Sequence, residues 1–294
     1  MRLPSARAAH GAMLLFTALV ATSFTVGGLI ADQLAPEALN FLRMLLAAAI
    51  FTALVAATEG LKRPGLADLA RYFTIAFTLV VFFVTMFAAL RLADPVSLGA
   101  VFTLVPLMSA LIGRPLLGQR ISPRIGFGLA IGAAGALWVL FDADWQKLLG
   151  FHLGKGEAIF FIGCAVYAAY SPAVRKLHRG ESLARLNMWA LGCGMILLLL
   201  YGGREIAVTD WRAVPWWAYL GIAYLAVFTT AITFYLIKSA SLVLPAAKVM
   251  AYTYLLPAFV ALYEALIGHG WPDIGVIAGI AVTAAAVAVI ETEG

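Results

Sequence analysis

An all-α integral membrane protein with ten transmembrane helices is the fold class that this sequence predicts. Of its 294 residues, 63% are hydrophobic and only 12% are charged, and the mean hydropathy is +0.96. The apolar residues gather into ten stretches of about twenty, and a helix of about twenty residues spans the hydrocarbon of a bilayer. These stretches form two halves that echo each other about 150 positions apart. The loops between them are too short to hold a soluble domain.

The first half of the chain holds five of the stretches. We expect helices at 9–31, 37–58, 70–91, 95–117 and 123–141. The first run follows basic residues, as the core of a signal peptide does. It is too long for such a core, however, and no small-residue cleavage site is clear. It is therefore interpreted as the first span.

The second half repeats the landmarks of the first, with helices expected at 154–175, 183–201, 214–237, 245–268 and 272–290. Pro95 and Pro106 bracket the core of the fourth span, and Pro245 and Pro257 bracket that of the ninth. Each half has five spans, an odd number, so the copies must have opposite orientations in the membrane, with a site where they meet at the midplane. We expect these inverted repeats at residues 1–145 and 150–294. Chance similarity between Leu- and Ala-rich helices is the alternative.

Lysine and arginine are distributed unevenly between the two sets of loops. Thirteen lie on the side of the N-terminus, Lys238 among them, and five lie in the opposite loops, while Arg43 and Lys248 fall inside spans. Cytoplasmic loops carry the excess of basic residues, so both termini are expected in the cytoplasm. Because the basic residues lie in loops, the net charge of +5 does not indicate nucleic-acid binding.

Short motifs built on proline, glycine and arginine carry a family resemblance. Pro36 and Arg43 stand seven positions apart at the start of the second span, and Pro95 and Pro106 precede the turn Gly118-Gln119-Arg120. The first pair resembles a Pro-x6-Arg signature, and the second set resembles a fourth-helix Pro…Pro…Gly-Glu-Arg pattern. Both belong to the drug/metabolite transporter superfamily, in its EamA-type branch of ten-helix carriers, and the resemblance covers nearly the whole chain.

The chain also departs from the family pattern. Gln119 and His269 stand where the family usually has Glu, and Tyr167 replaces a common Trp. Within the family, the sequence looks most like bacterial exporters of amino acids, in particular aromatic ones. The resemblance implies a multi-pass protein of the bacterial inner (plasma) membrane that exports small organic solutes by alternating access. An exporter of drugs, nucleosides or other metabolites is the nearest alternative, and a non-transporting membrane scaffold or enzyme is another.

Two basic residues inside spans are candidates for substrate binding. An arginine within the membrane must face protein, water or a headgroup. Arg43 therefore either holds a carboxylate or phosphate with its guanidinium fork or bonds backbone carbonyls; its counterpart in the other repeat is Asn187. Lys248 lies one helical turn before Tyr252, so the pair can hold a carboxylate while the ring stacks on an apolar group. Snorkelling of Lys248 to the headgroups is the alternative.

Other side chains away from the span ends are candidates for the lining of a cavity. Phe83, Tyr167 and Tyr170 offer aromatic surface, and Thr22 offers a hydroxyl, although packing is the commoner role of such residues in membrane helices. Pro106 and Pro257 each remove a backbone donor inside a helix, which predicts hinges for alternating access.

Some chemistry is not expected. No span has the central carboxylate that proton- or sodium-coupled carriers place deep in a helix, so uncoupled export fits better. The sequence has no phosphate-binding Gly-rich loop and no His/Cys metal spacing, which predicts no enzyme activity, no metal and no cofactor. The expected partners are a small-molecule substrate and membrane lipid. Gly128-x3-Gly132 and Gly275-x3-Gly279 allow close helix approach, either within a monomer or in a weak homodimer.

Overall fold

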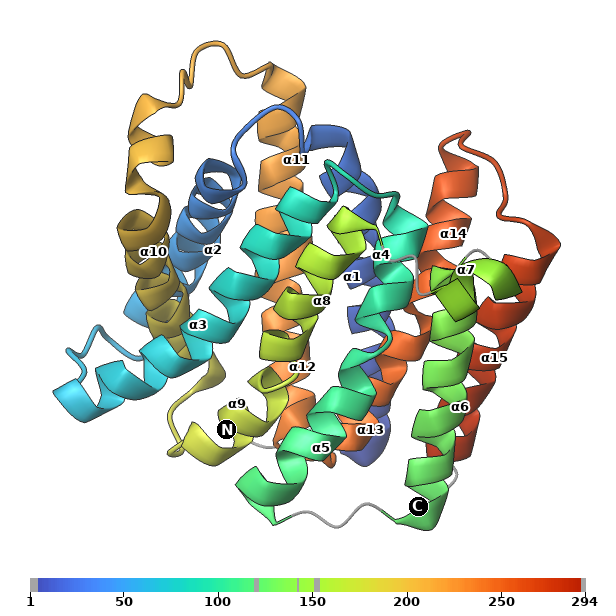
Figure 1. The fold of residues 1–294 in the computed structure, drawn as a ribbon. Helices are drawn as coiled ribbons and strands as arrows, with labels where there is room; N and C mark the ends of the chain where they lie inside the picture. The colour runs from blue at the N-terminus through green and yellow to red at the C-terminus, as the bar shows by residue number, and fades with distance from the viewer. Residues whose placement is uncertain (1–4, 119–121, 142, 151–153, 292–294) are drawn as a thin grey trace.

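The computed structural model describes residues 5–118, 122–141, 143–150 and 154–291. Within these ranges every regular element is a helix (Figure 1). Nine helical segments of the described chain are long and apolar enough to cross a membrane, and Ile274–Ile290 is a shorter apolar helix. The predicted all-helical membrane fold is thus confirmed. Gln119 and Arg120, which belong to the fourth-helix motif, lie outside the described residues.

The helices of the two halves follow the predicted order. The first half comprises α1 (Ala6–Ile30), α2 (Pro36–Thr58), α3 (Leu66–Ala89), α4 (Pro95–Phe102), α5 (Val105–Leu117), α6 (Pro123–Leu140) and α7 (Trp145–Gly150). The second half comprises α8 (Lys155–Tyr167), α9 (Tyr170–Leu177), α10 (Leu183–Val208), α11 (Trp216–Ala226), the π-helix η1 (Val227–Ile232), α12 (Thr233–Ser241), α13 (Ala246–Ala251), the 3₁₀-helix η2 (Tyr252–Leu255), α14 (Leu256–Leu266) and α15 (Ile274–Glu291).

Several helix ends follow directly from local sequence. Ser5, Ser122 and Ser182 cap α1, α6 and α10, because each hydroxyl accepts a hydrogen bond from a backbone N–H of the first turn. The predicted end of the seventh span, at residue 201, was too early. The α10 helix continues to Val208 across a local distortion at Gly202, where φ is −123° and ψ is 24°.

Four of the described spans are interrupted. The α4–α5 span breaks at Thr103–Leu104 and the α8–α9 span at Ala168–Ala169, while η1 and η2 interrupt the other two. Pro106 and Pro257, which were expected to kink or hinge their helices, both lie just after such an interruption. Each occupies one of the first two positions of the helix that follows the interruption. A backbone N–H at these positions has no acceptor within the helix, so proline costs no helical hydrogen bond there.

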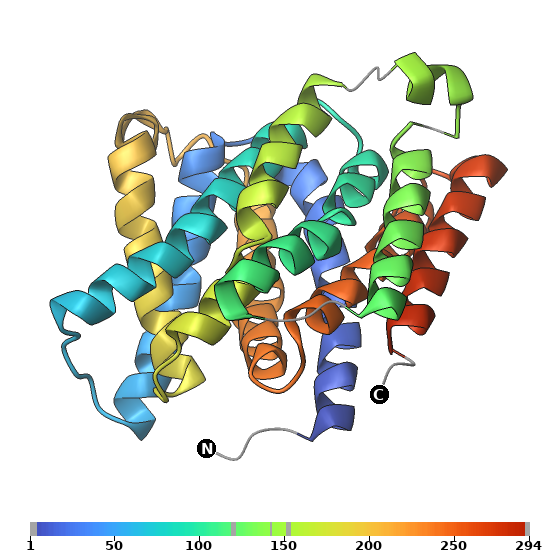
Figure 2. The same cartoon turned by 60° about the horizontal axis from the view of Figure 1, so that its bottom comes forward.

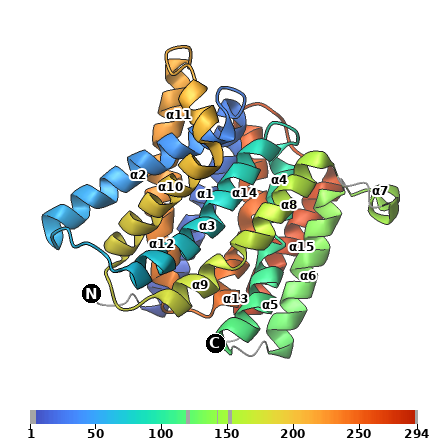
Figure 3. The same ribbon diagram turned by 60° about the vertical axis from the view of Figure 1, so that its left-hand side comes forward.

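The helices form one bundle in which the halves interlock. The helices α2 and α10 pack together at one edge and α6 and α15 at the opposite edge (Figures 1 and 3). Between these edges, α1 contacts α11, α12 and α14 of the second half, while α8 contacts α3 and α4 of the first. The start of α1 and the end of α15 lie at the same end of the bundle (Figures 1 and 2). We call this the terminal end.

Glycines explain the close contact of α6 with α15. A Cβ at Gly128 would lie 2.5 Å from Ile290 Cγ1, and one at Gly279 would lie 2.8 Å from Val139 Cγ2. No real side chain tolerates such approaches without a shift. The small residues therefore serve packing within this chain, which is one of the two roles expected of them.

Candidate functional site

A small cavity lies among the interrupted spans of the two halves. Its volume is about 20 Å³, room for about one water molecule and far too little for an organic solute. Six elements line it, through Phe16, Val20, Ser23, Phe82, Phe83, Met86, Phe102, Tyr167, Thr229, Thr233 and Phe234. Three of these residues lie at a break or in the π-helix: Phe102, Tyr167 and Thr229. Transporters place their substrate sites at discontinuous helices where two repeats meet, and π-bulges often mark functional sites. The central cavity is therefore the candidate site, and it is closed in this conformation.

Aromatic rings form a continuous wall around the cavity. Phe82 stacks on Tyr167 with 4.5 Å between ring centroids, and Tyr167 stacks on Tyr170 at 5.3 Å. On the other side, the rings of Phe83 and Phe234 stack at 6.1 Å. The predicted aromatic candidates Phe83, Tyr167 and Tyr170 are thus brought together, although only the first two line the cavity directly.

Arg43 is fully buried behind Phe83 and holds the π-helix. Its Cζ lies 4.1 Å from the centroid of the Phe83 ring. Its Nε donates to Thr230 Oγ1 at 2.6 Å, and Nη2 donates to the carbonyl oxygen and to Oγ1 of Thr229 at 3.0 and 2.8 Å. Three hydrogen bonds thus join Arg43 in the first half to the second half. Nη1 has no partner among the described residues, so one edge of the guanidinium stays available.

Lys238 is a second buried cation, and the expectation that it lies in a loop was wrong. It lies on α12 and is 0% exposed. Its Nζ donates to Asn187 Oδ1 and lies 5.6 Å from the ring centroid of Phe234 and 6.0 Å from that of Tyr170. A lysine near a predicted span end looks like a loop residue, because its position alone does not reveal which way the side chain points. Asn187, the predicted counterpart of Arg43, is its partner.

Several buried hydrogen-bond donors lie beside the cavity. Lys238 and Arg43 can only donate, and neither forms an ion pair with a carboxylate of the described chain. Asn187 Nδ2 and Tyr170 Oη are buried and have no partner among the described residues. Burying a charge is costly unless it is paired, and buried cations in membrane helices usually mark a substrate path. Such a set of donors is complementary to an anionic group such as a carboxylate.

The other predicted candidates lie away from this cavity. Lys248 is half-buried at the start of the ninth span, and Tyr252 Oη lies 2.8 Å from His10 Nδ1 near the beginning of α1. The hydroxyl of Thr22 donates to the Leu19 carbonyl oxygen at 2.7 Å and accepts from Tyr224 Oη at 2.9 Å. None of the three predicted residues lines the central cavity.

No carboxylate of the described chain lines the cavity either. Glu264 lies near the end of its span, as expected, but it is buried, with 6% of its surface exposed. Its Oε2 lies 2.6 Å from Nδ1 of His269. The burial of Glu264 was not foreseen, because it depends on the turn that brings His269 back against it.

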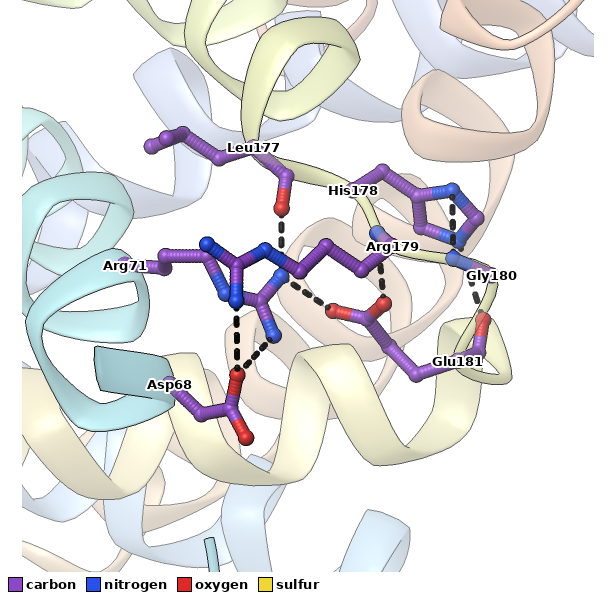
Figure 4. Close-up of polar contacts among 7 residues, drawn as sticks. All are labelled: Asp68, Arg71, Leu177, His178, Arg179, Gly180 and Glu181. Carbon is purple, nitrogen blue, oxygen red and sulfur yellow. Dashed lines mark hydrogen bonds and ion pairs between the residues drawn. The ribbon is translucent and has the colours of Figure 1, made fainter. Parts of the chain in front are cut away.

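An ion network lies at the terminal end of the bundle (Figure 4). Arg71 at the start of α3 donates to Asp68 Oδ1 at 2.7 Å and to Glu181 Oε1 at 3.0 Å, and also to the carbonyl oxygen of Leu177. The backbone N–H of Arg179 donates to Glu181 Oε2 at 2.7 Å. The network therefore joins the first half to the loop between α9 and α10.

A second ion pair joins the halves at the same end. Arg185 Nη2 of α10 lies 3.0 Å from Glu59 Oε2 at the end of α2. Within the first network, burial raises the pKa of the Glu181 carboxyl, but backbone N–H groups and Arg71 outweigh it and lower the pKa overall. The carboxylate is thus stabilised while the network is intact.

A bundle of apolar helices with interrupted spans and a closed central cavity is the architecture of a membrane transporter. Comparison with known proteins agrees, because the EamA-like transporter family matches residues 8–141 and again residues 154–292. The chain belongs to this family, which is part of the drug/metabolite transporter superfamily.

Two relatives extend the comparison. The chain is 21% identical to the uncharacterized transporter YyaM of Bacillus subtilis (strain 168), over 220 residues that make up 73% of this chain and 71% of YyaM. A solved crystal structure with 20% sequence identity matches with a TM-score of 0.75 and covers 98% of both chains. That likeness supports the fold alone.

Proposed function

We propose that this transporter carries small organic solutes with a carboxylate group, namely amino acids and in particular aromatic ones, across the bacterial inner membrane. The observation that carries the proposal is the buried donor cluster of Lys238, Asn187 and Tyr170 beside an aromatic cavity. In the open cavity, the carboxylate accepts hydrogen bonds from the cluster while an aromatic side chain stacks between the rings. Drugs and nucleosides without an anionic group would leave Lys238 unpaired.

We further propose that the two halves are inverted repeats with both termini in the cytoplasm. The double match to the family supports a repeat, and five spans in each half give opposite orientations. Removing Lys238 from the loop count leaves twelve basic residues on the terminal side against five opposite, so the expected orientation still holds. Alternating access would then open the cavity to one side of the membrane at a time, by movement at the interrupted spans.

Ligand-induced stabilisation of the purified protein tests the carboxylate requirement. We expect phenylalanine to raise the melting temperature in detergent by a few degrees, since a ligand at 100 times its dissociation constant adds about 2.7 kcal/mol. Phenethylamine, which has the same ring and amine but no carboxylate, should give no shift. Stabilisation by phenethylamine, or by nucleosides or drugs but by no amino acid, would contradict the proposed substrate class.

Replacing Pro257 by alanine is expected to slow turnover severalfold without changing substrate affinity. Alanine can continue a helix where proline cannot, so the interrupted ninth span becomes stiffer and moves less readily. Initial rates of exchange in proteoliposomes measure the effect, and Pro115→Ala in the last turns of α5 is the matched control. An unchanged rate of substrate exchange in the Pro257→Ala variant would show that the ninth span does not bend during transport.

Replacing Glu181 by glutamine is expected to loosen the terminal end. The variant loses the Arg71 ion pair, so amide hydrogen exchange in the loop at 178–182 should accelerate about tenfold. The lowered pKa of Glu181 stabilises the closed form fully above the ordinary glutamate pKa of about 4.3, and this stabilisation is lost as the pH falls below that value and through the lowered pKa of the folded protein. After correction for intrinsic exchange, the wild type should lose protection as the pH falls below about 4.

The exposed Glu205, at the other end of α10, provides the control. Glu205→Gln removes the same charge but belongs to none of the ion pairs of the terminal end. Amide exchange in the loop at 178–182 of this variant should therefore match the wild type. Equal protection in Glu181→Gln and wild type at every pH would show that the network does not hold this end closed.

A further inference from the structure

A groove runs along the outer surface of the bundle where α2 meets α10. Its volume is about 790 Å³. Its lining includes small residues, among them Ala49, Ala53 and Gly192, and the larger Trp189 and Met195. Figures 1 and 3 place both helices at the edge of the bundle, so the groove opens toward the bilayer rather than toward the central cavity.

The inner part of the groove is suited to hydrocarbon. Its one polar side chain from the two helices is Thr52, and the Thr52 hydroxyl already donates to the carbonyl oxygen of Ala48 at 2.7 Å. The position of Trp189 in this lining is supported by Tyr72, because the two rings stack with 6.4 Å between their centroids. An empty apolar recess of this size loses dispersion contacts along its whole lining, so an acyl chain is favoured there.

The groove ends at two cations. Lys62 and Arg63, in the loop between α2 and α3, are exposed and line this end. Neither forms an ion pair with a carboxylate of the described chain, and the nearby Glu59 is already paired with Arg185 at 3.0 Å. Lysine and arginine that flank a membrane span attract acidic lipids.

We propose that this groove is a binding site for an acidic phospholipid. One acyl chain lies over the alanines and Gly192, and the headgroup phosphate is held by Lys62 and Arg63. The occupant is a lipid because the apolar groove, about as long as several helical turns, leads to two cations without an ion-pair partner at the end of the α2 span. The site is separate from the central cavity and does not depend on the identity of the transported solute.

Native mass spectrometry of the detergent-purified protein tests the site, with dioleoylphosphatidylglycerol as the acidic lipid and dioleoylphosphatidylcholine as the zwitterionic one. We expect one phosphatidylglycerol to be retained in preference to phosphatidylcholine. The double variant Lys62→Ala/Arg63→Ala should bind phosphatidylglycerol about 30-fold more weakly and lose the preference. The control Arg204→Ala/Arg212→Ala removes two exposed cations from the opposite side, one in the last turns of α10 and one in the loop that follows, and should keep the preference.

A second pair of variants tests the apolar part. Ala53→Phe fills the groove and should weaken binding of both lipids, while Ala57→Phe, at an exposed position of α2 that does not line the groove, should not. Equal affinity for the two lipids, an equal loss in the Arg204/Arg212 control, or normal binding by Ala53→Phe would each overturn the proposal. A protein dimer abolished by Ala53→Phe would instead assign the groove to a second copy of the chain.

Discussion

Replacing Lys238 by methionine is expected to lower substrate affinity about a hundredfold or more while leaving the folded protein at least as stable as the wild type. The two effects separate because no carboxylate of the described chain lies within ion-pair distance of the buried Lys238, and Glu181, which attracts it from farther away, is already paired with Arg71. Removing a buried charge that has no ion-pair partner relieves a desolvation penalty, which favours the stability of the folded protein. Substrate binding is weakened instead, because the bound carboxylate is left buried without its cation, at a cost of about 3–5 kcal/mol. Methionine keeps the length of the side chain. Substrate-induced shifts in melting temperature, and the melting temperature of the free protein, measure the two effects.

Two further variants make this prediction specific. Lys176→Met removes an exposed lysine on α9 and should leave binding unchanged. Asn187→Asp should give Lys238 a carboxylate within the chain, which raises the melting temperature and blocks the anchor for substrate. If Lys238→Met melts far below the wild type but binds substrate normally once folded, the lysine is structural and the anchor lies elsewhere.

Replacing Arg43 by alanine is expected to lower the free energy of unfolding by about 3–5 kcal/mol. The change removes three hydrogen bonds from a charged donor to Thr229 and Thr230, and bonds of this type contribute about 1.5–3 kcal/mol each, partly offset by relief of the buried charge. Because these residues lie in η1, the π-helix should lose its support. Arg43→Lys should be intermediate, since an ammonium cannot reproduce the planar fork.

Thermal unfolding in detergent, together with transport by the folded fraction, measures the role of Arg43. Thr74→Val on α3, which removes a hydroxyl bonded only to its own helix at Ala70, is the control and should be nearly neutral. An Arg43→Ala protein that melts like the wild type but no longer transports would favour the other role considered for this residue, an anchor for the substrate.

The sequence predicted the ten apolar segments well, because hydropathy reports directly on what the bilayer requires of each span. It did not predict that the α8–α9 span and the π-helix η1 depart from a regular α-helix. Proline marks the region of the first break, but nothing local distinguishes Ala168–Ala169 or Val227–Ile232 from the helices around them. Such departures depend on partners distant in sequence, as when Arg43 holds Thr230 across 187 positions.

The candidate site was predicted in part. Phe83 and Tyr167 line the cavity. They were candidates because aromatic residues in the middle of a span can face the interior of the bundle. Lys248 was a candidate because it falls inside a predicted span, whereas Lys238 was counted in a loop, yet Lys238 is fully buried. Its pairing with Asn187 joins residues 51 positions apart, and only the packing of α10 against α12 brings them together.

Counterflow in proteoliposomes tests the central claim, that the donor cluster around Lys238 recognises the carboxylate of a transported solute. Vesicles loaded with unlabelled phenylalanine, phenethylamine or buffer are diluted into trace radiolabelled phenylalanine, with the proton and sodium gradients collapsed. We expect uptake only into vesicles loaded with phenylalanine, and none with Lys238→Met, whereas Lys176→Met should behave as the wild type. Uptake into phenethylamine-loaded vesicles, or full exchange by folded Lys238→Met, would contradict the claim.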